Sequence, residues 1–426
     1  MTVHAPIVPD APGRRTPHPF VYTILIVPFG AVSGYVTVAM AFLATKKGLS
    51  VEQGAALAAV SLLPQTWKFF WAPVVDITLT RKWWYVISAV LCAAGIVAMS
   101  AVPLEEKRLA LIEGVIFVAS LATTFLGMSL EALVAHATPP EQRGRVGGWF
   151  QAGNLGGTGL GGGAGLWMAM NLPAPWMSGA VLGALFLAGC AMLRFVPEPR
   201  AERPAPGQAG AGLARAMGDV AVDLWRTIRS RGGILCGALC ILPIGTGAAT
   251  NVLSESKVAA VWGVGADTVA TVNGVMNGLV SAFGCLVGGE ICARFSSRRV
   301  YVVVGLLMGT VAAGMALSPF APWSYVTFVL AYAFVTGLAY AAFTGFVLEA
   351  IGKGAAATKY NAFASLANTP IAYMTLVLAK AFSHWEAKGM LLTEAGAGVI
   401  GVLVFLGLAA AIGAGRRRGS DTATPI

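Results

Sequence analysis

Apolar blocks, each about as long as a membrane-crossing helix, follow one another along most of this 426-residue chain. A hydrocarbon core about 30 Å thick needs roughly 20 apolar residues in helical form. Lipid also requires that a segment satisfy its own backbone hydrogen bonds, as a helix does. Only 11% of the residues are charged, against about 25% in soluble domains. The pattern predicts an all-α membrane protein, whose twelve expected spans are 20–45, 54–75, 83–103, 109–137, 146–170, 176–196, 232–254, 268–293, 299–318, 322–350, 359–383 and 394–415.

The longest polar stretch, 197–231, separates the first six expected spans from the last six. Its first part is rich in proline, a composition typical of linkers. Residues 213–230 have the apolar spacing of an amphipathic helix, which either lies on the inner membrane surface or makes a regulatory contact. We therefore expect a six-helix bundle over 1–196, a cytoplasmic linker over 197–231 and a second six-helix bundle over 232–426.

Charged residues recur at matching places in the two halves. Asp76 and Arg294 stand at the ends of spans two and eight, and Glu131 and Glu349 stand in spans four and ten, at the same sequence separation. This correspondence favours two six-helix pseudo-repeats that run in parallel.

The Lys and Arg residues give the expected orientation. With the N-terminus placed in the cytoplasm, 21 of the 29 fall in cytoplasmic segments, six fall in external loops and two lie within spans. Positive charge accumulates on the cytoplasmic side of membrane proteins. Both termini are therefore expected to be cytoplasmic.

Several classes of function are disfavoured. The net charge of +10 does not indicate nucleic-acid binding, because the basic residues lie in short loops between apolar blocks. The cysteines have no His or acidic cluster beside them, so we expect no metal site. The glycine-rich fifth span lacks the Lys-Ser/Thr of a phosphate loop. The four histidines lie at or near polar ends, which argues against an intramembrane enzyme. We expect no catalytic residue, no cofactor and no obligate protein partner.

A charge inside a membrane span is costly and marks a functional candidate. Lys68 in span two and Glu131 in span four stand at similar depth in the same half. One hypothesis is that they exchange partners during a transport cycle, with Glu131 carrying a proton; the alternative is a static structural ion pair. Burial favours a neutral carboxyl and a nearby Lys favours the charged one, so a moving partner can switch its protonation.

A second group of charges stands at span ends and is expected to act as a conformational clamp. It comprises Asp76, Arg81, Lys82, Arg294 and Arg298. A carboxylate can cap the N-terminus of a neighbouring helix, and a basic pair can hold a facing carboxylate. Contacts of this kind form in one conformation and break in another.

Glu290 and Glu349, which lie near inner span ends, are expected to pair with Arg294 or Lys353. Polar side chains within spans are candidates for solute binding, although each alone is more often a hydrogen bond between helices. They are Gln65, Gln151, Asn154, Asn273, Asn277, Asn361, Asn368 and Tyr373.

Three segments carry a family resemblance. The segment Pro64–Asp76 has the pattern Pro-x-x-x-Lys-Phe-x-Trp-Ala-Pro-x-x-Asp, Pro140–Gly144 has an acidic-Arg-Gly turn, and Ala357–Tyr360 has Ala-Thr-x-Tyr. These segments resemble the AmpG-type muropeptide permeases and the related acetyl-CoA transporters, within the major facilitator superfamily. The chain departs from that pattern at Glu131 and His136, where those proteins commonly have Asp.

The resemblance implies a secondary active transporter of the bacterial inner membrane that takes up a periplasmic solute by alternating access. Muropeptides with protons are the first expectation, and a siderophore or another small polar solute is the alternative. The implied partners are the solute, protons and membrane lipid. A channel is disfavoured, because two halves joined by a linker suit alternating access.

Overall fold

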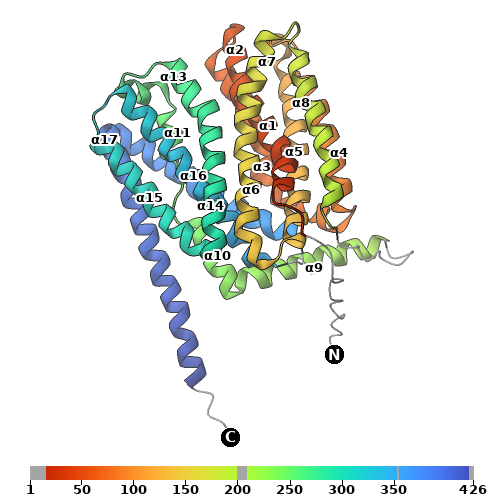
Figure 1. Cartoon of the computed structure of the whole chain (residues 1–426), viewed down its shortest axis with the longest axis vertical. Coiled ribbons are helices and arrows are strands. Elements are labelled where there is room, and N and C mark those ends of the chain that lie inside the picture. Colours follow the sequence, from red (N-terminus) through yellow and green to blue (C-terminus); the bar gives the residue numbers. More distant parts are fainter. Residues whose placement is uncertain (1–15, 199–208, 353–354, 422–426) are drawn as a thin grey trace.

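The computed structural model describes residues 16–198, 209–352 and 355–421. The parts of the predicted bundles and linker that fall on 1–15, 199–208, 353–354 and 422–426 lie outside the described residues. Helices make up most of the described chain and form two side-by-side bundles (Figure 1). The chain is an all-α multi-pass membrane protein with the twelve-span, two-half architecture that the sequence predicts.

The first half contains six membrane segments whose bounds lie within a few residues of the expected ones. Ser50 caps the second through a reciprocal capping box with Gln53, and the Thr80 side chain caps the third. The segments are α1 (Phe20–Gly34) continued by η1 (Tyr35–Met40) and α2 (Ala41–Lys46); α3 (Val51–Ile77); α4 (Arg81–Ala101); α5 (Leu109–Ala137); α6 (Arg143–Gly159) continued by η4 (Leu160–Ala164) and α7 (Gly165–Asn171); and α8 (Trp176–Gly189) continued by η5 (Cys190–Phe195).

The second half departs from the expected spans in two places. Its helices are α10 (Arg231–Ile241), α11 (Ala249–Leu253), α12 (Ser256–Ala259), α13 (Ala266–Ala270) continued by η7 (Thr271–Met276) and α14 (Asn277–Arg294), α15 (Ser297–Leu317), α16 (Pro322–Ile351) and α17 (Ala356–Asp421). The last two expected spans are both contained in α17, whose two helical segments meet at Glu386 (φ 57°, ψ −166°).

The seventh span, expected as one helix over 232–254, is interrupted between α10 and α11. Pro243 follows the end of α10, where its missing N–H and its ring disfavour a continued helix. Gly245 and Gly247 then adopt φ of +62° and +60°, values that L side chains rarely adopt. The non-helical segment between α10 and α11, residues 242–248, is called the span-seven break below.

Length and composition alone identify eight described helices as able to cross a membrane. That set omits α3, the glycine-rich α6 and the interrupted α10–α11, and it counts α17 once although α17 holds two spans. Adding the three omitted segments and the second span of α17 gives the twelve spans. The three omitted segments are polar, glycine-rich or broken, and all three line the cavity described below.

The two halves meet chiefly where α6 packs on α14 and α16 and where α3 and α5 pack on α17. Glycine makes the first contact close: a Cβ on Gly148 would lie 2.5 Å from the carbonyl oxygen of Cys285 and from the Cα of Gly289. Small residues allow such close helix approach in membranes.

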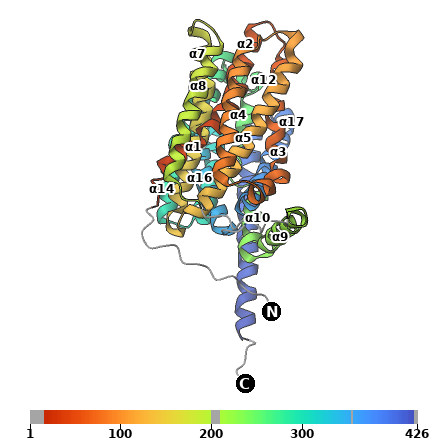
Figure 2. The same cartoon turned by 90° about the vertical axis from the view of Figure 1, so that its right-hand side faces the viewer.

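The linker contains a helix, α9 (Ala209–Arg229), that crosses the outside of one end of the bundles (Figures 1 and 2). The last turns of α17 project from the same end, which is called the linker end below. Asp223 of α9 pairs with the buried Lys359 of α17 at 3.0 Å. Met217, Trp225 and Ile228 of α9 are exposed.

Candidate functional site

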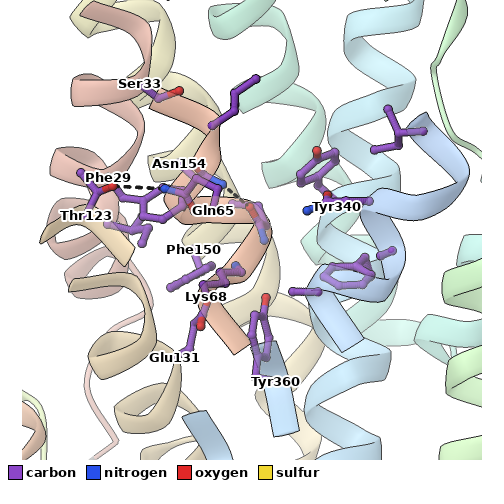
Figure 3. A pocket seen from close by; sticks show the side chains of 18 of the residues that line it. Phe29, Ser33, Gln65, Lys68, Thr123, Glu131, Phe150, Asn154, Tyr340 and Tyr360 are labelled. Carbon is purple, nitrogen blue, oxygen red and sulfur yellow. Dashed lines mark hydrogen bonds between the residues drawn. The ribbon is translucent and has the colours of Figure 1, made fainter. Parts of the chain in front are cut away.

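A cavity of about 300 Å³ lies between the two halves. Its walls come from α1, α3, α5 and α6 of the first half and from α15, α16, α17 and the span-seven break of the second. Aromatic rings contribute much of the surface, and amide and hydroxyl groups are distributed among them (Figure 3). An apolar cavity with a few directed polar groups is the usual form of a small-molecule site.

Four of the polar residues selected from the sequence line this cavity: Gln65, Gln151, Asn154 and Asn368. The Gln65 amide donates to Thr123 Oγ1 at 3.1 Å, and the Asn154 amide donates to Gln151 Oε1 at 2.9 Å. Gln151 in turn donates to Thr344 Oγ1 of the second half at 2.8 Å. These bonds fix the amide orientations at the cavity wall.

The other four polar candidates are not among the residues that line the cavity. Asn273 donates to the Tyr325 hydroxyl at 2.9 Å, and Asn277 accepts from Ser281 at 3.2 Å. Tyr373 donates to the carbonyl of Ile241. The fourth, Asn361, is fully buried beside Glu131.

Lys68 and Glu131 both line the cavity, from α3 and α5. Figure 3 shows them close together with Tyr360, at the end of the cavity away from Ser33. They are 8% and 6% exposed. Glu131 Oε2 accepts a hydrogen bond from Asn361 Nδ2 at 2.6 Å, so this carboxylate contacts the second half. Lys68 interacts electrostatically with Glu131, but no direct ion pair joins them among the described contacts.

Asp76 caps the N-terminus of α17 across the boundary between the halves. Its Oδ2 accepts from the backbone N–H and the hydroxyl of Thr358 at 2.9 and 2.8 Å, and its Oδ1 accepts from the N–H of Ala357 at 3.3 Å. A negative charge at a helix N-terminus is favourable because the free N–H groups and the helix dipole are positive there.

The remaining clamp residues lie at the linker end with different partners. The backbone N–H groups of Arg81 and Lys82 donate to the carboxylate of Glu198, which caps α4. Arg298 pairs with Glu349 at 3.9 Å within the second half. Arg294 lines a shallow surface depression.

The partner expected for Glu290 is wrong. Glu290 pairs not with Arg294 but with Arg145 of the first half, at 2.8 Å. The sequence does not show that α6 and α14 face one another at this point, so sequence proximity favours Arg294, a residue on the same helix. Lys353, the other expected partner, lies outside the described residues.

In the described chain, the side-chain hydrogen bonds that join the halves lie at the cavity or toward the linker end. They run from Asp76 to α17, from Asn361 to Glu131, from Gln151 to Thr344 and from Arg145 to Glu290. The linker end is therefore closed in this conformation.

Glu394, a carboxylate of α17 that is 5% exposed, is a buried charge that no sequence pattern indicated. Its Oε2 accepts from the Tyr332 hydroxyl at 2.7 Å, and its Oε1 accepts from the N–H of Ala249, at the start of α11, at 3.3 Å. It thus holds the end of the span-seven break, whose Gly245 and Thr246 line the cavity. The described residues include no cluster of His, Cys, Asp and Glu able to hold a metal ion.

Comparisons with known proteins agree with this arrangement. A family model described as Major Facilitator Superfamily matches residues 22–375. The human organic anion transporter MFSD10 has a similar structure, with TM-score 0.67 and 16% identity over 91% of this chain and 98% of that one. No curated protein sequence matches the chain.

Two sugar transporters are also similar. The E. coli fucose:proton symporter FucP has a TM-score of 0.67 and 14% identity, over 91% of this chain and 97% of that one. The proton:xylose symporter XylE bound to 6-bromo-6-deoxy-D-glucose has a TM-score of 0.60 and 15% identity, over 90% of this chain and 94% of that one. At these identities the likeness establishes the fold.

Proposed function

Since the chain belongs to the major facilitator superfamily, we propose that it takes up a periplasmic solute together with protons by alternating access. The observation that carries the proposal is the placement of Glu131. This carboxylate faces a cavity between the halves and also accepts a hydrogen bond from the opposite half. A group in that position senses both the contents of the cavity and the relative position of the halves.

Protonation of Glu131 would loosen the linker end. A hydrogen bond to a charged carboxylate is stronger than one to a neutral acid. A proton that reaches Glu131 through the cavity therefore weakens its bond with Asn361 and favours separation of the halves there. Once that end opens, water from the cytoplasm stabilises the charged carboxylate, and the proton leaves.

Two further contacts hold the linker end closed. Asp76 holds α17 to α3 only while the linker end is closed, and Arg145 holds α14 to α6. Opening must break both contacts. In this scheme Lys68 remains with α3 and stabilises the charged form of Glu131 before and after the proton is carried. The competing account, in which Lys68 and Glu131 are a static pair, requires no change at Asn361.

Three observations bear on the solute. The segment resemblance favours muropeptides. The cavity volume of about 300 Å³ lies at the lower limit of ligand pockets and instead favours a smaller polar solute. The similar structures point the same way, because they are those of an organic anion transporter and two sugar symporters. Uptake by membrane vesicles of a panel containing a muropeptide, a siderophore, a peptide and a sugar would decide between these solutes.

We place the protein in the bacterial inner membrane with the linker end and both termini in the cytoplasm, on the distribution of Lys and Arg. A reporter that is active only outside the cytoplasm should be active when fused after residue 106 or 387. It should be silent when fused after residue 144 or 210. The reverse pattern would overturn this orientation.

A further inference from the structure

Lys68 is the one cation among the described residues that line the cavity, and Glu131 is the one anion. The rest of the lining is uncharged. Lys68 is 8% exposed, so most of its surface is out of water, and an ammonium group has three N–H donors to satisfy. A charge removed from water is costly unless it is paired and hydrogen-bonded.

The two charges differ in how well they are satisfied. Glu131 has a donor from Asn361 at 2.6 Å. The ammonium of Lys68 has no hydrogen bond and no direct ion pair among the described contacts, although it faces the cavity beside Glu131 and Tyr360 (Figure 3). The cavity thus presents unused charged donors on one wall.

We propose that the transported solute carries an anionic group, such as the carboxylate of a muropeptide, and that Lys68 binds it. The inference rests on the proposed proton coupling and extends it to the charge of the solute. With both side chains ionised the cavity is neutral, and an anion entering it meets Glu131 as a like charge. With Glu131 protonated the cavity carries one positive charge, which an anion neutralises.

Proton and anion therefore favour each other's binding. By linkage, if a proton on Glu131 raises the affinity for the anion, then the bound anion raises the affinity of Glu131 for the proton by the same factor. The charges that face Glu131 from the helices packed against it are Lys68 of α3 and, when ionised, the phenol of Tyr360 of α17. A cationic solute would have the opposite effect and would expel the proton.

The test uses two probes of nearly the same shape, N-acetylmuramic acid and its carboxamide, with the purified protein. The acid should bind about thirtyfold more tightly than the amide at pH 6, since loss of one partner from a buried charge pair has an effect of that order or larger. Lys68→Gln should abolish this preference and Lys68→Arg should keep most of it. Lys380→Gln is the matched control, because Lys380 is another Lys within a span but is exposed and lies outside the cavity.

The pH dependence supplies a second readout. Binding of the acid to the unsubstituted protein should weaken as the pH rises and Glu131 ionises. Glu131→Gln should bind the acid with little change as the pH rises, because its amide does not titrate. Binding of the carboxamide should change little in either protein.

Three outcomes would overturn parts of the account separately. Equal binding of acid and amide, or an acid preference that survives Lys68→Gln, contradicts the anion site even if uptake proves proton-driven. Proton coupling is tested separately. If the acid preference depends on Lys68 but an uncoupler does not affect accumulation, the anion site stands and proton coupling is contradicted. If neither probe binds but a larger muropeptide does, equal binding of that muropeptide and its carboxamide likewise contradicts the anion site.

Discussion

Among the described residues, each half contains one deeply buried carboxylate within a span, and the two are held differently. Glu131 of the first half lines the cavity and accepts its hydrogen bond from Asn361 of the second half. Glu394 of the second half accepts from Tyr332 and Ala249, which belong to the same half, and does not line the cavity. Their exposed fractions are nearly equal, at 6% and 5%.

Burial alone therefore does not distinguish a transport residue from a structural one. The partners do. Contacts between the halves must be remade when the halves move, whereas contacts within a half persist. We expect Glu131 to act in the transport cycle and Glu394 to stabilise the span-seven break, which in turn forms part of the cavity wall.

The largest expected effect on folding is at Glu394. Glu394→Ala leaves the Tyr332 hydroxyl and the Ala249 N–H buried without an acceptor, which should lower the free energy of unfolding by about 2–5 kcal/mol. Thermal unfolding of the purified protein in detergent measures this change. Glu394→Gln keeps an acceptor oxygen and should cost less. Glu131→Gln, the matched change in the other half, should leave the melting temperature close to that of the unsubstituted protein.

A melting temperature that falls further for Glu131→Gln than for Glu394→Ala would reverse the comparison. It would make Glu131 and Lys68 a structural pair, and the proton would have to bind elsewhere.

The next effect concerns the balance between conformations. Cys292 of α14 is buried against Gly144 of the first half, so a chain that retains only this cysteine reports opening of the linker end. Asp76→Asn removes the negative charge that caps α17, which should cost the closed form about 1 kcal/mol. Thiol labelling of Cys292 should accelerate about fivefold. Asp219→Asn, at an exposed acid of α9, is the control and should have no effect.

The same labelling assay sharpens the contrast between the two carboxylates. Glu131→Gln imitates the protonated acid and should also accelerate labelling of Cys292, whereas Glu394→Gln should leave the rate unchanged. Faster labelling in Glu394→Gln alone would show that the span-seven break, and not the contact with Asn361, controls the linker end.

The smallest effect is expected at the exposed pair Arg145 and Glu290, whose side chains are 49% and 46% exposed. Exposed ion pairs contribute little and are screened by salt. Arg145→Gln should therefore change the labelling rate of Cys292 by less than about twofold at low salt and not measurably at high salt. A larger change that persists at high salt would give this pair a role comparable with that of Asp76.

The spans could be predicted from the sequence because hydropathy and helix length directly reflect the membrane. The expected span 109–137 coincides with α5, and most others differ by a few residues. The span-seven break was missed because the apolar run continues through Pro243 and Gly245. Membrane helices often accommodate proline and glycine, so the residues themselves did not reveal a break.

The site was partly predictable for a similar reason. Lys68 and Glu131 were selected because a charge within a span is costly wherever it faces. Amides are tolerated on several faces, so their type did not show that Gln65 and Asn154 line the cavity while Asn273 and Asn277 do not. Predicting that distinction requires knowing which helices are neighbours.

Glu394 was missed because the twelfth span was expected to begin there, where an acid would be close to water. The second segment of α17 instead follows Glu386 directly, which places Glu394 about two helical turns inside. Its partners, Tyr332 and Ala249, come from distant parts of the sequence. No local pattern identifies them.

The most direct test of the account is solute movement in vesicles that contain Glu131→Gln. The substituted protein should insert normally, lose accumulation driven by the proton gradient, and still exchange solute across the membrane, because the cavity and the movement of the halves remain. Normal accumulation that an uncoupler still abolishes would contradict the account and place the proton site on another residue.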